Sequence, residues 1–519
     1  MVVGDIAIYN TRLYPAKPGI VDLDTRLTWE KVNERTNRLA HAMLDLGLKK
    51  GDRAAMISEN RHECVEFLFA AAKTGVIGFF LNYRFTPESL SDIINDSQPR
   101  LIITQDKYLP SLNEMTSKAG SIDHVVVIGE GDGYENLIAS YDPGEPRIEV
   151  NEYDTYLLQY TTGSTGMPKG VELTHKNVLA NATNRFFFGR QPEDCVYMSP
   201  GSFFAIGSLG HVFCALYISA TLAIPPFSGQ NFVETIEREK VTYTYLNPTT
   251  FSLVKDFIES SERRYDLSSM THLAIGGGQP CTADQAREIL DYFQIPYGNS
   301  SKVYGQSEIF SAATFLLPSV LGEALKSGAS EKEREKAESI GKPLGNTEVR
   351  VVDDDGHDVP PRTEGEILLK GDGLMKGYWQ RPELTAQVVR DGWYYTRDMG
   401  YFDEDGYVYF TDRKDFLIKS GGLFVSPMEV EKVILQHPAV EDVAVIGPLD
   451  KKWGQRVEAL IQLKQGVSTD EEEIKNFCRE HLARFKVPKS VEFIDKIPRE
   501  SVYGKINRKE LLNLYGNES

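Results

Sequence analysis

Apolar positions in the N-terminal part of the chain switch repeatedly between helical and strand spacing. Between residues 29 and 46 they recur on one face of a helix, and Gly47 supplies a stop. The next apolar segment, DRAAMIS at 52–58, predicts a short buried strand, as do RLIIT at 100–104 and HVVVIG at 124–129. This alternation predicts crossover units, mainly parallel sheets and an α/β fold.

The pattern changes toward the C-terminus. Between about residues 341 and 410, short β-rich runs separated by Asp-Gly turns predict an antiparallel substructure. From about residue 416, helix-like and strand-like segments describe a compact α+β unit of about one hundred residues. No long Pro/Ser linker precedes this unit, so we expect a short hinge between a large N-terminal domain with several subdomains and a small C-terminal domain.

Composition agrees with a globular protein of several domains. The chain has 519 residues, of which 41% are hydrophobic and 25% charged, which matches soluble globular averages. The net charge of −18 argues against a nucleic-acid partner, because phosphate backbones need a basic surface. Basic residues inside motifs are therefore the more informative ones.

Cysteines and apolar runs indicate a cytoplasmic protein. The five cysteines are widely separated and form no CxxC pair, so neither a zinc site nor a disulfide framework is predicted. The first ten residues lack the basic start and apolar core of a signal peptide. The most apolar run, Val212–Ile224, is too short to span a bilayer and predicts a buried helix.

The stretch YTTGSTGMPKG, from Tyr160 to Gly170, has the composition of an anion-binding loop. Its glycines let backbone N–H groups converge, its hydroxyls add donors and Lys169 adds positive charge, which together suit a phosphate chain. Gly163, Gly166 and Lys169 are spaced by three, unlike the glycines and lysine of the P-loop. For the segment taken alone, a surface turn is the alternative.

Further motifs decide between these alternatives. They occur in order along the chain as LNYRFTPESLSDIINDS at 81–97, VYGQSE at 303–308, GWYYTRDMG at 392–400, DRKDFLIKSGG at 412–422 and YGKINRKEL at 503–511. Together with the glycine-rich loop, these motifs resemble the adenylate-forming acyl-CoA synthetases, acid–thiol ligases related to luciferase and to peptide-synthetase adenylation domains. The resemblance covers nearly the whole chain.

The resemblance implies a domain organisation and a two-step reaction. It implies an N-terminal domain at 1–411, a hinge at 412–416 and a mobile C-terminal domain at 417–519 that rotates over a shared active site. A carboxylate would attack the α-phosphorus of ATP and release pyrophosphate, and the thiol of CoA would then displace AMP. ATP, Mg²⁺ and CoA are the expected cofactor and co-substrates, and a carboxylic acid is the expected substrate.

The resemblance also assigns residues to ATP. The phosphate-binding residues would be Thr161, Thr162, Gly163, Ser164, Thr165, Gly166 and Lys169. The adenine- and ribose-binding residues would be Gly276, Gly277, Tyr304, Gly305, Ser307, Asp398 and Arg413. Glu308 would bind Mg²⁺, since a hard divalent ion that bridges phosphates needs carboxylate oxygen. For Glu308 a plain surface position is the alternative, and for Tyr304 a core position.

Catalysis and domain motion would depend on Lys505 and Asp415. By resemblance, Lys505 is the cation that stabilises the charge of the transition state, with Glu308 and Lys169 as the other catalytic residues. Asp415 takes the hinge position, for which a surface turn is the alternative. In the motifs TRD and DRKD, Arg397 and Asp412 replace glycines usual in the family, and the two side chains could pair with each other.

The acyl pocket is expected around residues 247–251, around 276–280 and after Glu308. The residues named for it are Phe251 and Gly278, with Phe204 as a gate between the acyl pocket and the thiol tunnel or as plain core. These stretches contain no basic residue, which favours an apolar aliphatic or aromatic monocarboxylate. For CoA, the resemblance names Gly421, Gly422, Trp453 and Lys486, with solvated lysines as the alternative.

We therefore expect a cytoplasmic acyl-CoA synthetase without a transmembrane segment and with homodimer formation left open. One alternative is a standalone adenylating enzyme that loads the phosphopantetheine thiol of a carrier protein. Another is oxidation of the adenylate, as in luciferase. A third is a catalytically silent homologue that serves as a binding module.

Overall fold

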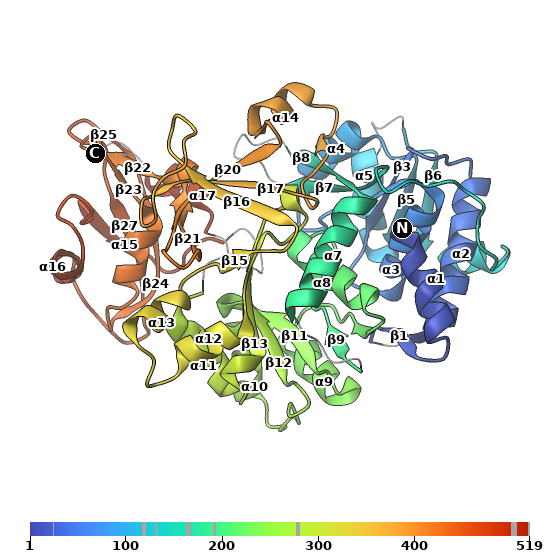
Figure 1. Cartoon of the computed structure of the whole chain (residues 1–519), viewed down its shortest axis with the longest axis horizontal. Coiled ribbons are helices and arrows are strands. Elements are labelled where there is room, and N and C mark those ends of the chain that lie inside the picture. The colour runs from blue at the N-terminus through green and yellow to red at the C-terminus, as the bar shows by residue number, and fades with distance from the viewer. Residues whose placement is uncertain are drawn as a thin grey trace. The chain divides into compact units, whose positions relative to one another are not determined.

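The computed structural model describes residues 1–23, 25–116, 121–129, 131, 133–161, 168–189, 194–276, 281–499 and 506–516 (Figure 1). Two compact units make up the chain. The first contains Met1–Gly277, Cys281–Val349 and Leu369–Tyr394, and the second contains Arg350–Leu368 and Tyr395–Ser519. Among the described residues, no helix combines the length and hydrophobicity needed to cross a bilayer.

The first unit contains a seven-stranded sheet. In spatial order its strands are β18 (Gly377–Tyr378), β8 (Lys169–Thr174), β7 (Thr155–Thr161), β4 (Ile77–Phe80), β3 (Arg53–Ile57), β5 (Leu101–Gln105) and β6 (His124–Ile128). The three strands predicted from the sequence, β3, β5 and β6, are confirmed and run parallel. Only the pairs β7–β8 and β8–β18 are antiparallel in this sheet.

Helices alternate with these strands, as the sequence predicts. They are α1 (Gly4–Leu13), α2 (Trp29–Asp45), α3 (His62–Thr74), α4 (Pro87–Ser97), the short η1 (Asp106–Tyr108), α5 (Leu109–Thr116) and α6 (Gly133–Ala139). The predicted helix at 29–46 is α2. Its first turn is capped by the Thr28 side chain, which accepts a hydrogen bond from the Lys31 amide, and the chain leaves the helix through Gly47 at φ 83°.

The first unit also contains a nine-stranded sheet. Its strands, in spatial order, are β15 (Lys342–Pro343), β14 (Thr314–Leu316), β13 (Ser300–Tyr304), β12 (His272–Ile275), β11 (Tyr243–Leu246), β9 (Val196–Met198), β10 (Thr221–Ala223), β1 (Pro18–Val21) and β2 (Arg26–Thr28). The central strands from β13 to β1 are parallel, and the outer pairs are antiparallel. Parallel strands need crossover connections, which here are mostly helical.

The helices that belong to this part of the chain are α7 (His175–Gly189), α8 (Ile206–Tyr217), α9 (Gly229–Glu239), α10 (Pro248–Ser260), α11 (Ala283–Tyr292), η2 (Tyr297–Asn299), η3 (Ser307–Ile309), α12 (Pro318–Leu325) and α13 (Glu331–Lys336). Helices α7 and α8 lie side by side (Figure 1). The prediction of one buried helix at Val212–Ile224 is correct only for its first half. Ser219 has φ 56°, so the chain leaves the helix there and continues as β10.

The predicted antiparallel substructure is confirmed as a five-stranded sheet. Its strands follow the order β16 (Thr347–Val352), β17 (Gly365–Gly371), β20 (Trp393–Phe402) and β19 (Val389–Arg390), with β21 (Val408–Arg413) also paired to β20. Helix α14 (Pro382–Val388) precedes β19. The pairs β19–β20 and β20–β21 are antiparallel, as the Asp-Gly turns predict.

The C-terminal part of the second unit is a compact α+β structure. One sheet contains β23 (Leu423–Val425), β22 (Ile418–Ser420), β26 (Gly454–Gln455) and β25 (Leu449–Asp450), and another contains β24 (Val440–Ile446), β27 (Glu458–Leu463) and β28 (Ser490–Phe493). The helices are η4 (Lys414–Phe416), α15 (Pro427–Ile434), α16 (Glu471–His481) and α17 (Arg508–Tyr515). A buried apolar cluster that includes Val430, Val443, Ile461 and Ile474 joins α15 and α16 to the second sheet.

Candidate active site

The β7–β8 hairpin holds both ends of the predicted phosphate loop. Thr161 pairs with Lys169, and Tyr160 pairs with Gly170. A side chain at Gly170 would meet the ring of Tyr160 at 3.1 Å and the Cβ atom of Trp379 at 3.3 Å, so the close packing there favours glycine. The loop residues Thr162, Gly163, Ser164, Thr165 and Gly166 lie outside the described residues.

Tyr378 joins two of the predicted catalytic side chains. Its hydroxyl donates to a carboxylate oxygen of Glu308 over 2.9 Å, and the Lys169 ammonium lies 5.6 Å from the centre of its ring. Strand β18, which carries Tyr378, pairs with β8, which begins at Lys169. The carboxylate predicted to bind Mg²⁺ and the cation predicted to bind phosphate thus both contact one tyrosine, which sequence reasoning missed.

The backbone around Glu308 is sharply turned. Glu308 lies in η3, and its carbonyl accepts a hydrogen bond from the Met375 amide over 2.8 Å. Phe310 and Ser311 follow with φ angles of 41° and 80°, a conformation uncommon for residues other than glycine. The second carboxylate oxygen of Glu308 has no hydrogen-bond partner in the described part of the chain, and the side chain is half-buried. A partly exposed carboxylate oxygen of this kind is a suitable ligand for Mg²⁺.

The predicted adenine-binding motif forms a local network. Gln306 accepts a hydrogen bond from the Tyr394 hydroxyl over 3.0 Å and donates to the Tyr304 hydroxyl over 3.4 Å. A side chain at Gly305 would lie 2.1 Å from the Ser311 carbonyl oxygen, so only glycine fits. Ser307 is buried beside them. The motif therefore folds as one unit, with Gln306 as a linking residue that the sequence analysis did not single out.

The remaining predicted site residues of the first unit contact neighbours other than Glu308, Tyr378 and Lys169. Gly276, at the end of β12, has φ 153°, and Gly277 and Gly278 lie outside the described residues. The ring of Phe204 meets Tyr83 edge-on with centroids 5.2 Å apart. Phe251 packs edge-on against Tyr292 and Phe293 at 5.4 and 5.8 Å. Because Phe251 is buried between α10 and α11, we assign it to core packing.

In the second unit the two predicted ribose-binding residues form an ion pair. Asp398 on β20 and Arg413 on β21 are register partners, and the guanidinium Nε of Arg413 donates to the Asp398 carboxylate over 2.8 Å. Asp398 is almost completely buried, whereas Arg413 is partly exposed. Strand pairing therefore explains why the two motifs, separated in sequence, present their polar side chains together.

The residues that replace family glycines do not pair with each other. Arg397 makes an ion pair with Asp415, with its Nε atom 2.8 Å from the carboxylate. Asp412 instead accepts hydrogen bonds from the Ser426 hydroxyl over 2.5 Å and from the Met428 amide over 3.0 Å, at the start of α15. Arg397 has φ 62°, so it keeps a backbone conformation that glycine adopts more easily.

The predicted CoA-binding residues form two separate contacts. A side chain at Gly421 would touch the Trp453 ring at 3.2 Å, and Gly421 and Gly422 both have positive φ angles. Lys452 and Lys489 lie 4.9 and 5.1 Å from the Trp453 ring centre. Lys486 donates to both carboxylate oxygens of Glu429, the longer contact being 2.6 Å.

Lys505 lies outside the described residues. The residues that flank segment 500–505 are described, and Arg499 and Ile506 pair as an isolated antiparallel bridge. Just beyond, Arg508 donates to the buried Glu431 carboxylate over 2.6 Å. The start of α17 is therefore anchored to α15.

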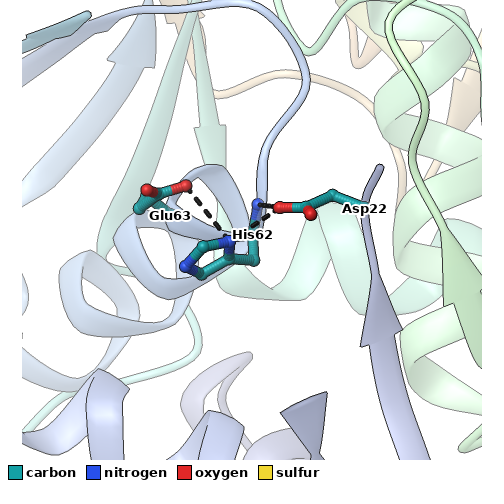
Figure 2. A group of neighbouring side chains, drawn as sticks. All are labelled: Asp22, His62 and Glu63. Carbon is teal, nitrogen blue, oxygen red and sulfur yellow. Dashed lines mark hydrogen bonds and ion pairs between the residues drawn. The ribbon is translucent and has the colours of Figure 1, made fainter. Parts of the chain in front are cut away.

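A buried charged group elsewhere in the first unit also offers metal-ligand atoms. Asp22, His62 and Glu63 point toward one another (Figure 2). However, Asp22 accepts from the Nδ1 atom of His62 over 2.7 Å, and Glu63 accepts two hydrogen bonds from Arg61 at 3.0 and 3.1 Å. Because these carboxylates already have cationic partners, we interpret the group as a structural charge network.

Comparison with known proteins identifies the class of this chain. Residues 9–379 match the model of the AMP-binding enzyme, and residues 429–502 match the AMP-binding enzyme C-terminal domain. The chain therefore belongs to the AMP-binding enzyme family, the adenylate-forming acyl-CoA synthetases, as the motifs predict.

Individual relatives agree with this assignment. The chain is 33% identical to a feruloyl-CoA synthase from Amycolatopsis sp., with 99% of both chains covered. It is 32% identical to a 2-succinylbenzoate–CoA ligase from Geobacillus kaustophilus, over 97% of this chain and 96% of the relative. A solved fatty acyl CoA synthetase from Mycobacterium tuberculosis shares 29% identity and a TM-score of 0.79, over 99% and 98% of the two chains.

Proposed function

We propose that this protein is an ATP-dependent acid–thiol ligase that forms an acyl-adenylate and then an acyl-CoA thioester. The observation that carries the proposal is the Glu308–Tyr378–Lys169 group, in which one tyrosine positions a carboxylate and a cation beside the hairpin of the phosphate loop. Carboxylate plus cation is the pair of charges that a nucleoside triphosphate with its divalent ion requires. The family match along both parts of the chain supports the same reaction.

In the first step the substrate carboxylate attacks the α-phosphorus of ATP and pyrophosphate leaves. Lys169 and the loop that precedes it would hold the β- and γ-phosphates, and Tyr304 with its network would position the adenine. Glu308 would hold Mg²⁺, which neutralises phosphate charge when bound. Tyr378 keeps the Glu308 carboxylate oriented while leaving one oxygen open. Lys505 would stabilise the charge that develops between the carboxylate and the α-phosphate.

In the second step the thiol of CoA attacks the acyl carbon and AMP leaves. Asp398 and Arg413 would bind the ribose hydroxyls in both steps, because a carboxylate accepts and a guanidinium donates hydrogen bonds. The glycine turn at Gly421 and Gly422 and the Trp453 ring with its two lysines would contact CoA. Of these cations, Lys452 and Lys489 suit its phosphates better than Lys486, which is paired with Glu429.

The domain limits, the hinge at Asp415 and the cytoplasmic location are part of the same proposal. The pairing of Asp415 with Arg397 places an ion pair at the proposed hinge. Homodimer formation stays open. For the acid, the sequence favours an apolar monocarboxylate, and the experiment below compares that prediction with the alternative argued in the next subsection.

The experiment is pyrophosphate release from ATP and Mg²⁺ with short, medium, long-chain, aromatic and dicarboxylic acids, with and without CoA. Acid-dependent release that becomes multiple-turnover only with CoA, and yields AMP and acyl-CoA, is the expected result. A single burst that CoA cannot extend would favour a carrier-protein acceptor. Absence of release with every acid would contradict the proposal and favour a catalytically silent homologue.

A further inference from the structure

The first unit buries one arginine among neutral groups. Arg185, on α7, has an exposed fraction of 6%. Its NH2 atom donates to the Ser311 hydroxyl over 2.8 Å, its Nε atom donates to the Asn181 side chain over 3.2 Å, and its NH1 atom lies 3.4 Å from both ring nitrogens of His211. A guanidinium has five N–H donors, so its contacts with the described residues use only part of its capacity.

No carboxylate lies within ion-pair distance of Arg185 in the parts of the chain that the structure describes. Burying a cation without a counter-charge costs on the order of several kcal/mol. Proteins therefore ordinarily pair a buried cation with a carboxylate. The half-buried Arg35 of the same unit follows that rule. It contacts the carboxylates of Glu66 and Glu135.

The side chains around Arg185 are uncharged. Burial and the positive charge of Arg185 hold the pKa of His211 well below its usual value, so this imidazole is neutral. The ring of His211 stacks on Tyr245 with centroids 4.0 Å apart, and its Nδ1 atom contacts the Tyr197 hydroxyl. Burial raises the pKa of Tyr243, the next tyrosine in this group, to about 12. The site thus offers hydroxyl and imidazole groups around one cation.

The segments that build this group are those expected to line the acyl pocket. Ser311 lies in the stretch after Glu308, and Tyr245 lies on β11 immediately before the 247–251 segment. Helix α8, which carries His211, begins two residues after Phe204. Glycine at position 210 keeps the helices close, since a side chain there would come within 2.3 Å of Ser311 and 3.1 Å of Arg185.

We propose that Arg185 determines substrate specificity by binding a second carboxylate of the acid, at the end away from the carboxylate that reacts with ATP. The inference rests on the proposed ligase function and names its substrate class as acids with two carboxylates. A guanidinium binds a carboxylate through two parallel hydrogen bonds, and Ser311 and Tyr197 are close enough to Arg185 or His211 to add hydroxyl contacts. The sequence argument for an apolar acid missed Arg185 because it lies on α7, outside the stretches searched for basic residues.

The test compares acids that differ only in the second carboxylate. Pyrophosphate release would be measured with 2-succinylbenzoate against 4-oxo-4-phenylbutanoate, terephthalate against benzoate, and adipate against hexanoate. We expect kcat/KM to be higher for the dicarboxylate by roughly 100-fold in at least one pair, the scale of a lost charge-assisted hydrogen bond in a buried site. Equal or better use of the monocarboxylate in every pair would overturn the assignment.

Variants then connect the preference to Arg185. Arg185→Met keeps the length of the side chain and removes the charge, so it should abolish the preference by lowering kcat/KM for the dicarboxylate alone. Arg185→Lys should restore part of it, because the charge returns without the planar fork. The control is Arg238→Met, which removes the same charge from an exposed position on α9 and should leave kcat/KM unchanged for both acids.

The outcomes distinguish this inference from the proposed function. An Arg185→Met variant that lowers turnover of both acids equally would indicate a structural role and overturn the specificity assignment. If that variant fails to fold, the wild-type comparison of matched acids still decides. Release of pyrophosphate with monocarboxylates only would contradict the Arg185 assignment, whereas no release with any acid would contradict the ligase function itself.

Discussion

At the residue scale, Tyr378 shows how a side chain without reactive chemistry can organise a site. It contacts Glu308 through its hydroxyl and Lys169 through its ring, so the two opposite charges are held by different parts of one side chain. Its position follows from the pairing of β18 with β8. A lone tyrosine in a GYW stretch carries no signal of this role in the sequence, because the contact depends on a strand more than two hundred positions away.

Tyr378→Phe isolates the hydroxyl contact. The ring remains beside Lys169, but the Glu308 carboxylate loses its only hydrogen-bond donor among the described residues. Because a hydrogen bond to a charged group contributes roughly 1.5–3 kcal/mol, we expect at least a tenfold loss of adenylation efficiency and a higher Mg²⁺ requirement. Pyrophosphate release against Mg²⁺ concentration measures both. Tyr394→Phe, which removes a hydroxyl bonded to Gln306, should leave the Mg²⁺ dependence unchanged, and an equal shift in both variants would contradict the role of Tyr378.

Arg397 combines backbone strain with an exposed ion pair. Its φ of 62° costs a residue other than glycine about 1 kcal/mol, while the exposed pair with Asp415 contributes roughly 0–1 kcal/mol. Arg397→Gly and Arg397→Ala both remove the pair, but only glycine relieves the strain. We therefore expect Arg397→Gly to be more stable than Arg397→Ala by about 1 kcal/mol in urea unfolding of the full chain. Equal stability of the two variants would mean that position 397 is not strained.

At the element scale, local patterns predicted most of the fold. Helix α2 is delimited by its Thr28 cap and Gly47, and the strands β3, β5 and β6 are short apolar runs bounded by polar residues. Such signals are contained within one segment. The apolar run at Val212–Ile224 misled the prediction because a hydrophobic run has no helical or strand period, and the change at Ser219 depends on the packing around β10.

The candidate site was predictable only in part for the same reason. The ordered motifs pointed to Lys169, Glu308, Asp398 and Arg413. In the first unit Lys169 and Glu308 both contact Tyr378, and in the second unit Asp398 and Arg413 form an ion pair. Tyr378, Gln306 and Arg185 carry no local signal, since their importance comes from partners distant in the chain. The partner of Arg397 is likewise decided by tertiary packing.

The charge network around His62 links the elements α2, α3 and α6. His62 faces the carboxylates of Asp22, Glu63 and Glu66. Glu66 also accepts hydrogen bonds from Arg35 on α2 and from Tyr134 on α6. Arg35 also contacts Glu135, and Arg61 donates to Glu63. Burial alone would lower the pKa of His62, but the hydrogen bond to Asp22 and the three carboxylate charges raise it overall. The protonated imidazole is therefore favoured in the folded state.

We predict that this network stabilises the protein more at pH 6 than at pH 8.5. A histidine whose pKa is raised on folding contributes fully below its unfolded value of about 6.5, and the contribution disappears as pH rises through the folded pKa. The buried His175 and His211, whose pKa values burial lowers, change stability with pH in the opposite direction, so the effect of His62 is read from the difference between wild type and variant. His62→Gln should lower the urea midpoint more at pH 6 than at pH 8.5. The exposed His357→Gln serves as control. An equal fall of the midpoint at both pH values in His62→Gln would show that the pKa of His62 does not differ between the folded and unfolded states.

The Asp22 carboxylate affects the stability of the protein at acidic pH. Burial would raise its pKa, but the hydrogen bond and charge of His62 lower it to about 2. Its contribution is therefore present above about pH 4, the unfolded value, and is lost as pH falls toward 2.

At the scale of the whole molecule, the proposed reaction divides its chemistry between the two units. The Glu308–Tyr378–Lys169 group belongs to the first unit, and the Asp398–Arg413 pair belongs to the second. Lys505 also belongs to the C-terminal part of the chain, on a segment flanked by the Arg499–Ile506 bridge. If a single cation from this part serves only the adenylation step, its removal should affect one half-reaction and spare the other.

Lys505→Ala tests that division of labour. The substitution removes the cation expected to meet the carboxylate and the α-phosphate, so adenylation should fall by roughly 10²–10³-fold, the scale of a lost electrostatic donor. Formation of the thioester from acyl-adenylate supplied in advance should survive, because in that step the thiol attacks the acyl carbon and the attack on the α-phosphorus that Lys505 is proposed to assist is already complete. Lys509→Ala, an exposed lysine on α17, is the matched control and should leave both steps unchanged. Equal loss of both half-reactions in Lys505→Ala would contradict the separation, since it would mean that the same cation supports adenylation and thioester formation alike.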